Sequence, residues 1–127
     1  MEEKKIIQTE QAPTPIGPYS MGVAIGNHIF TAGQLGIDPK SGEIVAGGIQ
    51  AETRQALSNI KHILEAAGSS LENVVKTTVY LRDMTDFNQM NAVYGEFFPK
   101  NCPARTTVQA AALPKNAAVE IEAIAFR

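Results

Sequence analysis

The chain has 127 residues, 44% of them hydrophobic, and a net charge of −2, which predicts one globular domain over residues 1–127 without the basic surface of a nucleic-acid-binding protein. The charged N-terminus lacks the apolar stretch of a signal peptide, and no segment approaches membrane-spanning length, so we expect a cytoplasmic protein with no membrane partner. One cysteine and two histidines form no cluster at metal-ligand spacing, so we expect no metal site.

The first half of the chain predicts a hairpin, a turn and a helix, with a short strand possible before them. The residues are 4–8 for the short strand, 19–26 and 28–34 for the hairpin, 38–42 for the turn and 50–67 for the helix. Gly26 and Asn27 tolerate the positive φ of a hairpin turn. Apolar side chains of the helix recur at three- and four-residue spacing, and Gly68 suits its left-handed end.

The second half predicts a strand, a helix and two further strands. The residues are 73–82 for the first strand, and 104–111 and 118–127 for the last strands, with the helix between them. Asp83 or Thr85 can cap the helix, whose apolar stripe runs from Phe87 to Phe98. Two helices with one apolar stripe each cover one face of a sheet, so the predicted fold is an α+β two-layer domain with an uncovered sheet face.

Strand alternation sorts the side chains of the last two predicted strands into opposite sets. In one strand the sets are Arg105, Thr107 and Gln109 against Ala104, Thr106 and Val108, and in the other Glu120, Glu122 and Ile124 against Val119, Ile121 and Ala123. One side of the sheet has the composition of a core. The other mixes charged, hydroxyl and apolar groups, including Thr78 and Tyr80, which suits a subunit interface with polar pockets or, alternatively, plain solvent exposure.

Two charged residues are the first candidates for a functional site. Arg105 follows the loop that Pro103 stiffens, where its guanidinium fork could bind a carboxylate through two parallel hydrogen bonds. The alternative is an ordinary ion-pair arginine. Glu120 lies on an otherwise apolar strand, where a carboxylate is costly unless it is paired or used. It could orient water or move protons, or it could pair with a lysine or arginine across an interface.

Two neutral segments could complete such a site. Three prolines and a glycine within residues 13–18 stiffen the backbone and place Tyr19 where the hairpin starts, so its phenol could donate a hydrogen bond or pack at the sheet edge. Small residues within residues 30–36 permit a ligand or another backbone to approach closely, or they mark a bulge. Cys102 has no feature of a reactive thiol, and we interpret it as a bystander.

Seven segments spread over nearly the whole chain resemble the Rid family of reactive intermediate deaminases, which is also described as YjgF-like. They are IGPYS at 16–20, TAGQ at 31–34, DPKSG at 38–42, EAAG at 65–68, VKTTVYL at 75–81, PAR at 103–105 and VEIEAIA at 119–125. Their number, order and spacing carry the resemblance. It implies a chorismate-mutase-like α+β fold, with a mixed sheet and two helices on one face, assembled as a homotrimeric barrel with clefts between subunits.

The resemblance also implies an activity that needs no cofactor. The family hydrolyses reactive enamine and imine acids, such as 2-aminoacrylate and 2-iminobutanoate, to 2-keto acids and ammonia. At matching positions Arg105 would bind the substrate carboxylate and Glu120 would position or activate water. The substrate-binding residues around them would be Tyr19, Thr31, Gly33, Asn91 and Thr107.

Thr107 is the one departure from the family pattern, and the sequence also leaves two alternative functions open. Many relatives carry a cysteine where this chain has Thr107, so thiol chemistry is excluded there, while the backbone groups of that residue remain available to substrate or water. The alternative to the enzyme is a non-catalytic small-molecule-binding or regulatory trimer of the same fold. A ribonuclease or translation inhibitor is less favoured, because the composition is mildly acidic.

Overall fold

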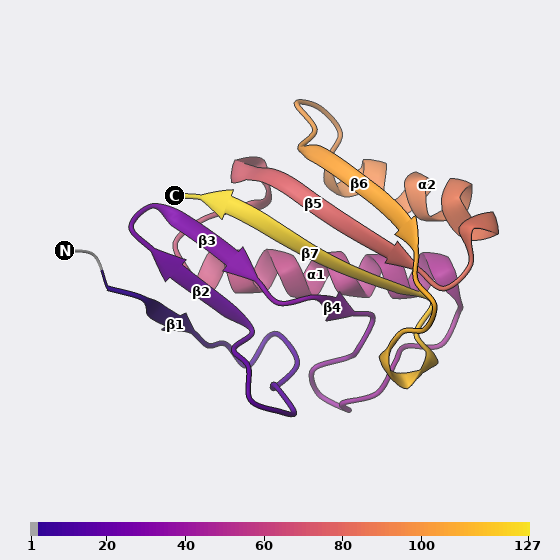
Figure 1. Cartoon of the computed structure of the whole chain (residues 1–127), viewed down its shortest axis with the longest axis horizontal. Helices are drawn as coiled ribbons and strands as arrows, with labels where there is room; N and C mark the ends of the chain where they lie inside the picture. The colour runs from indigo at the N-terminus through magenta and orange to yellow at the C-terminus, as the bar shows by residue number, and fades with distance from the viewer. Residues whose placement is uncertain (1–2) are drawn as a thin grey trace.

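The computed structural model describes residues 3–127 and places one layer of strands on one layer of helices (Figure 1). The elements in chain order are β1 (Lys5–Ile7), β2 (Gly22–Ile25), β3 (His28–Thr31), β4 (Gln34–Leu35), α1 (Ile49–Ala66), β5 (Val74–Leu81), α2 (Phe87–Phe97), β6 (Ala104–Gln109) and β7 (Val119–Phe126). Short 3-10 turns precede β5, α2 and β7, at η1 (Leu71–Asn73), η2 (Met84–Asp86) and η3 (Pro114–Asn116). The predicted order of strands and helices is therefore confirmed.

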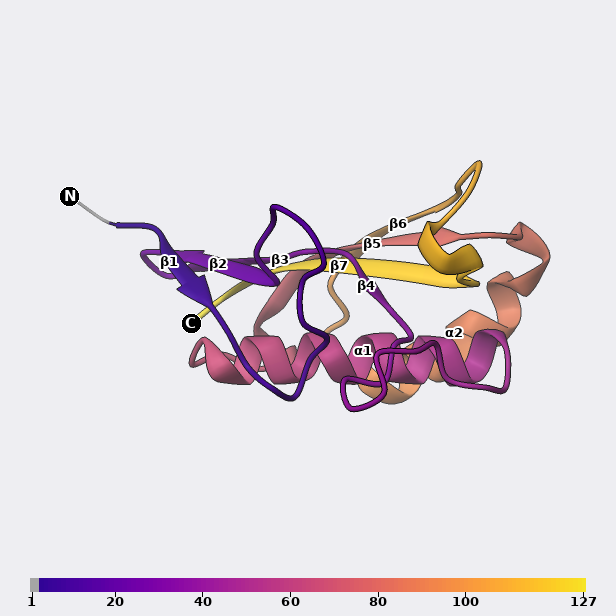
Figure 2. The same cartoon turned by 90° about the horizontal axis from the view of Figure 1, so that it is seen from below.

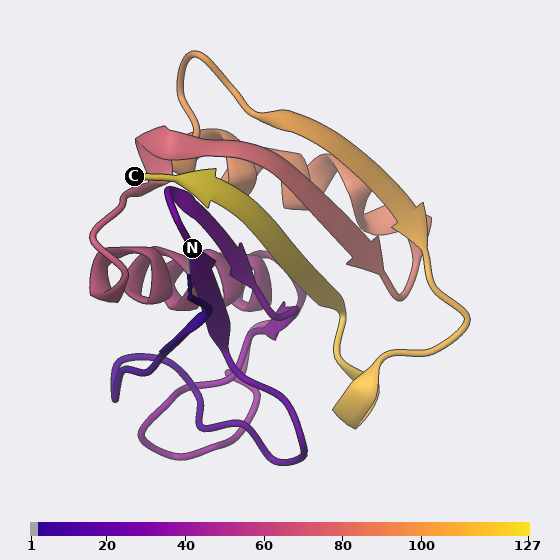
Figure 3. The ribbon, with the colours of Figure 1, turned by 60° about the vertical axis from the view of Figure 1, so that its left-hand side comes forward.

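The strands form one mixed sheet. Its order is β1-β2-β3-β7-β5-β6, and β4 continues beside β7 after β3 has ended. β5 and β6 run parallel because α2 connects them, whereas the other described pairs are antiparallel. Figure 3 shows β7 running between β3 and β5, with β6 at the edge of the sheet.

The core lies between the sheet and the helices, which both cover the same face (Figure 2). The apolar stripe of α1 is buried without exposed surface, as the three- and four-residue spacing predicts, at Leu57, Ile60, Ile63 and Leu64. Gly68 follows the helix with a φ of 80°, the left-handed conformation expected at a helix end. The Asp83 carboxylate accepts a hydrogen bond from the backbone N–H of Thr85 at 2.9 Å and so caps η2, whereas α2 itself begins after Asp86 without the side-chain cap that was predicted for it.

The hairpin strands are shorter than predicted, because the chain bulges after β3. Between Phe30 and Gln34 the chain advances four residues while its partner β7 advances three, from Ile124 to Ile121, so one extra residue is inserted. The bulge that was one interpretation of the small residues is thus present. The Thr31 hydroxyl oxygen compensates for the interrupted ladder by accepting a hydrogen bond from the Ala123 N–H at 3.0 Å.

The other face of the sheet is not covered by a helix, as predicted. The side chains on it include those of Lys76, Thr78 and Tyr80 on β5, Thr106 and Val108 on β6, and Glu120 and Glu122 on β7. Apolar groups such as Phe30 and Val108 are exposed. Within residues 3–127 no helix is long and apolar enough to cross a membrane.

Candidate active site

Arg105 points to the helix-covered face of the sheet. It pairs in register with Thr77 on β5, whose side chain is buried beneath α2. The guanidinium carbon lies 4.7 Å from the ring centroid of Tyr94 and 5.5 Å from that of Phe87. Among residues 3–127 no carboxylate is at ion-pair distance from Arg105, since the one ion pair there joins Arg54 and Glu96. Within this part of the chain, Arg105 is therefore not an ordinary ion-pair arginine.

Unpartnered polar groups gather around this guanidinium. A pocket of about 460 Å³ beside Arg105 is lined by Asn91, Tyr94, Gly95, Phe98, Cys102 and Pro103. The amide oxygen of Asn91 and the hydroxyl oxygen of Thr107 are buried without a hydrogen-bond partner in the described chain. Buried polar groups almost always have a partner, so these atoms are available to a ligand. We call Asn91, Tyr94, Arg105 and Thr107 the arginine cluster.

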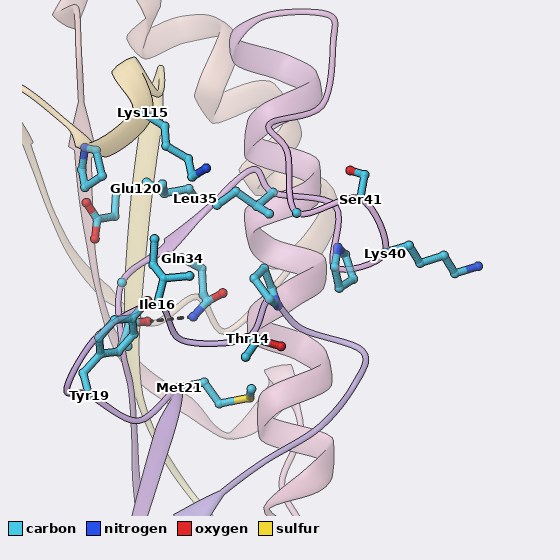
Figure 4. A pocket seen from close by; sticks show the side chains of 17 residues that line it. Thr14, Ile16, Tyr19, Met21, Gln34, Leu35, Lys40, Ser41, Lys115 and Glu120 are labelled. Carbon is cyan, nitrogen blue, oxygen red and sulfur yellow. Dashed lines mark hydrogen bonds between the residues drawn. The ribbon is translucent and has the colours of Figure 1, made fainter.

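Glu120 points to the opposite face of the sheet. Glu120 pairs with Tyr80 on β5, whereas Arg105 pairs with Thr77 on the same strand. Thr77 and Tyr80 are three residues apart, and side chains an odd number of residues apart on a strand point to opposite faces of the sheet. The carboxylate borders a cavity of about 680 Å³ whose other lining residues include Tyr19, Gly33, Gln34 and Lys115. Figure 4 shows Tyr19 and Glu120 on one side of this cavity and Lys40 and Ser41 across from them. We call it the glutamate pocket.

The carboxylate of Glu120 is close-packed and poor in charge partners. Burial raises the pKa of Glu120 above its ordinary value, and the negative charge of Glu122 on the same strand raises it further. A Cβ atom at Gly33 would lie 2.8 Å from the Glu120 Cδ and 3.0 Å from its Cγ, so only a glycine leaves room for this side chain. The close approach that the small residues predicted is therefore made by Glu120 itself.

Buried polar residues of α1 hold the walls of the glutamate pocket, and they are not among the residues predicted from the sequence. Glu52 accepts a hydrogen bond from the Ala118 N–H at 2.8 Å, just before β7. The amide of Asn59 donates to the carbonyl oxygens of Leu35 at 3.2 Å and Ile37 at 3.0 Å, on either side of Gly36. Glu52 and Asn59 are seven residues apart and both buried, so a polar pair within the apolar face of the helix was the available signal.

The structure thus sorts the predicted site residues into two groups on opposite faces. Arg105 and Asn91 line one pocket, with Thr107 two residues along β6 on the same face of the sheet, and Tyr19, Gly33 and Glu120 line the other. Thr31 lines neither pocket, and its hydroxyl oxygen is bonded to the backbone of β7, which leaves its hydrogen free to donate. In residues 3–127 no group of three His, Cys, Asp or Glu side chains is placed to hold a metal ion.

Comparison with known proteins identifies the family. Residues 9–127 match the family model described as Endoribonuclease L-PSP. A RutC family protein of Pyrococcus horikoshii is 58% identical over 98% of each chain, and human 2-iminobutanoate/2-iminopropanoate deaminase is 49% identical over 98% of this chain and 90% of the human one. The crystal structure of Escherichia coli TdcF with bound serine has a TM-score of 0.93 and 46% identity over 97% of this chain and 98% of that chain. The chain therefore belongs to the Endoribonuclease L-PSP family, which is the YjgF/Rid family that its motifs resemble.

Proposed function

We propose that the protein is a hydrolytic deaminase of reactive enamine and imine acids, and that each active site joins the arginine cluster of one subunit to the glutamate pocket of another. The observation that carries the proposal is the separation of these two groups on opposite faces of one sheet. The arginine cluster has buried polar atoms that lack partners, and the Glu120 carboxylate has no ion-pair partner within residues 3–127. The reaction class is supported by curated mammalian relatives at about 50% identity, which are named 2-iminobutanoate/2-iminopropanoate deaminase.

In the proposed reaction Arg105 binds the substrate carboxylate. Its guanidinium lies on aromatic rings and has no carboxylate partner within residues 3–127, so its N–H groups can form two parallel bonds to a ligand. The buried Asn91 and Thr107 oxygens lie near this position and can accept hydrogen bonds from the substrate nitrogen or from water. TdcF, a relative of the same fold, was crystallised with serine, which also carries an α-carboxylate.

Glu120 then acts on water at the other end of the substrate. The enamine tautomerises to the imine, and a water molecule beside Glu120 adds its oxygen to the imine carbon while the imine nitrogen gains a proton. The carbinolamine collapses to the keto acid and releases ammonia, so one water is consumed for each C–N bond broken. A carboxyl group with a raised pKa exchanges protons closer to neutral pH than an ordinary one, which suits this step. Free imines already hydrolyse in water, so positioning supplies much of the rate enhancement needed.

A closed ring of subunits would complete every such site. The arginine cluster and the glutamate pocket are different surfaces of the chain, so the contact that joins them is heterologous. Heterologous contacts form closed rings when the rotation between neighbours closes, and a ring of three copies would contain three complete sites. The uncovered sheet face, with exposed Phe30 and Val108, offers apolar area for this contact. Among closed rings we propose a homotrimer, because that is the assembly that the resemblance to the family implies.

The test is the rate of keto-acid release when a dehydratase generates 2-aminoacrylate or 2-iminobutanoate in the assay. We expect the protein to accelerate release over buffer and Arg105→Ala to lose this acceleration. Arg54→Ala is the matched control, because it removes a guanidinium that pairs with Glu96 on the helix surface. No acceleration by a folded oligomeric sample would contradict the deaminase proposal and favour a small-molecule-binding or regulatory protein.

A filter-binding assay with RNA at physiological salt addresses the ribonuclease class that the family description names. The net charge of −2 predicts no retention of RNA, since electrostatic contact with phosphates supplies most non-specific binding. Salt-dependent retention, or cleavage of the RNA, would contradict this expectation.

A further inference from the structure

We infer that Tyr94 is a positioning residue for Arg105: its ring is the platform that holds the guanidinium ready for a carboxylate. The inference rests on the proposed role of Arg105 as the carboxylate clamp. It adds a function for a buried residue of α2 that otherwise belongs to the core.

The position of the Tyr94 ring is fixed from three sides. Its hydroxyl shares a buried hydrogen bond of 2.7 Å with the Thr77 hydroxyl, and Thr77 is the residue that pairs with Arg105 across β5 and β6. Its ring packs on Phe98, with centroids 4.8 Å apart and planes tilted by 39°. The helix backbone is the third constraint. A ring held in this way can hold the cation that lies 4.7 Å from its centroid.

A platform of aromatic rings suits a clamp better than a counterion does. A carboxylate beside Arg105 would occupy its donors and compete with the carboxylate of the substrate. A cation–π contact instead attracts the charge of the guanidinium to the ring face. Phe87 adds a second ring at 5.5 Å, and no carboxylate in residues 3–127 is at ion-pair distance. The guanidinium is therefore restrained while it remains free to bind an acid.

The phenol of Tyr94 stays neutral in this environment. Burial raises the pKa of Tyr94 above its ordinary value, although the Thr77 hydrogen bond and the positive charge of Arg105 oppose the shift. A phenolate would form an ion pair with Arg105 and weaken the clamp. Because the hydroxyl remains protonated, Tyr94 presents no negative charge to the cation, and its ring face attracts the guanidinium through the ring quadrupole.

The platform is tested by removing the ring, or only its hydroxyl, in the full-length protein. We expect Tyr94→Leu to raise the KM for 2-iminobutanoate by about 3- to 10-fold, with kcat changed less than about 2-fold, and Tyr94→Phe to stay near the wild type. L-serine and 2-oxobutanoate binding, measured by titration calorimetry, should weaken by a similar factor. Phe97→Leu is the matched control, because it removes a ring of the same helix that is not in contact with Arg105.

The control separates positioning from packing. A merely structural role would lower the Tm of Tyr94→Leu and of Phe97→Leu alike and leave the KM and the binding constants of both unchanged, and this result would overturn the inference. Should Tyr94→Leu fail to fold, Tyr94→pentafluorophenylalanine keeps the ring shape but reverses its quadrupole. An unchanged KM relative to Tyr94→Phe would then overturn the inference, and a raised KM would support it.

One measurement does not depend on catalysis. The NMR signal of the Arg105 Nε–H should carry a ring-current shift that Tyr94→Phe retains and Tyr94→Leu loses. If the wild type neither deaminates imines nor binds serine, the proposed function fails while this signal still decides whether Tyr94 holds Arg105. A signal that is the same in all three proteins would overturn the inference even if the deaminase activity is found.

Discussion

The arginine cluster and the glutamate pocket each expose a charged group, but they prepare it in different ways. Arg105 lies against two aromatic rings on the helix-covered face, whereas Glu120 lies against Gly33 at the edge of a cavity of about 680 Å³ on the other face. Neither charge has an ion-pair partner within residues 3–127. The comparison teaches that the fold restrains both charges by ring contacts or close packing rather than by ion pairs within the described chain, which leaves each one free for a ligand or for another chain.

The largest effect should come from mixing two inactive variants. Arg105→Ala and Glu120→Gln, each assembled alone, should lose nearly all deaminase activity, because every site contains one defect. After co-refolding in equal amounts, about a quarter of the sites should join an intact arginine cluster to an intact glutamate pocket, and activity should recover to about that fraction. Keto-acid release by the whole pool of co-refolded oligomers measures it. No recovery would mean that both groups act within one chain.

The second largest effect should come from replacing Gly33, which contacts Glu120, and it should differ from the effect of replacing Gly36, which contacts α1. Gly33→Ala places a Cβ against the end of the flexible Glu120 side chain, so the carboxylate must move while the fold adapts easily. Because misplacement by about 1 Å can cost on the order of 100-fold in rate, we expect a large loss of kcat with little change in Tm.

Gly36→Ala is the matched control for this prediction. Its Cβ would lie 2.6 Å from the Glu52 Cα and 2.7 Å from the Glu52 carbonyl oxygen, so it meets the backbone of α1, which cannot turn aside. Here we expect Tm to fall clearly in thermal unfolding. Equal losses of Tm in both variants would contradict the idea that Gly33 serves Glu120 rather than the fold.

The pH dependence of activity should report the glutamate pocket and not the arginine cluster. Because burial raises the pKa of Glu120, the acidic limb of the kcat/KM profile should lie above the ordinary pKa of a glutamate, and activity should fall as pH drops through it. Glu122→Gln removes the neighbouring negative charge, which is the second cause of the raised pKa of Glu120. This variant should move the acidic limb to lower pH, by less than the shift that burial causes. Glu96→Gln, on the helix surface, should leave it in place. A limb that Glu122→Gln does not shift would contradict this account.

The parts of the fold that depend on local pattern were predicted well from the sequence. The apolar spacing of α1, the hairpin turn at Gly26 and the Asp83 cap are each determined within a few residues. The break between β3 and β4 was predicted only as one of two interpretations of residues 30–36, because the space above Gly33 is filled by Glu120, far along the chain. Strand order and the parallel pairing of β5 with β6 are likewise non-local.

The site was predictable by residue type but not by arrangement. Arg105 and Glu120 stand out in the sequence because a guanidinium after a rigid loop and a carboxylate on an apolar strand are both unusual. That they point to opposite faces follows from the pairing of Thr77 with Arg105 and of Tyr80 with Glu120, which alternation within single strands cannot provide.

The smallest effect, and the most specific to the arginine cluster, concerns the residue that replaces the cysteine of many relatives. The Thr107 hydroxyl oxygen is buried without a partner in the described chain, and removing such a group without leaving another unpaired costs nothing. Thr107→Val should therefore keep or raise the free energy of unfolding, by about 0 to 1 kcal/mol, in denaturant titrations without ligand. If the hydroxyl accepts a hydrogen bond from the substrate, the same variant should raise KM by about 2- to 10-fold.

Thr107→Ser is the matched control, since it retains the hydroxyl and should retain the KM of the wild type. A stability gain combined with a binding loss would show that this part of the arginine cluster is kept for the ligand at the expense of the fold. A loss of stability in Thr107→Val would instead show that the hydroxyl has a partner in the assembled protein. That partner would be a bound water molecule or a group of the neighbouring subunit, because residues 3–127 of the chain itself provide none. Either way, the hydroxyl of the arginine cluster would then be satisfied before any substrate arrives.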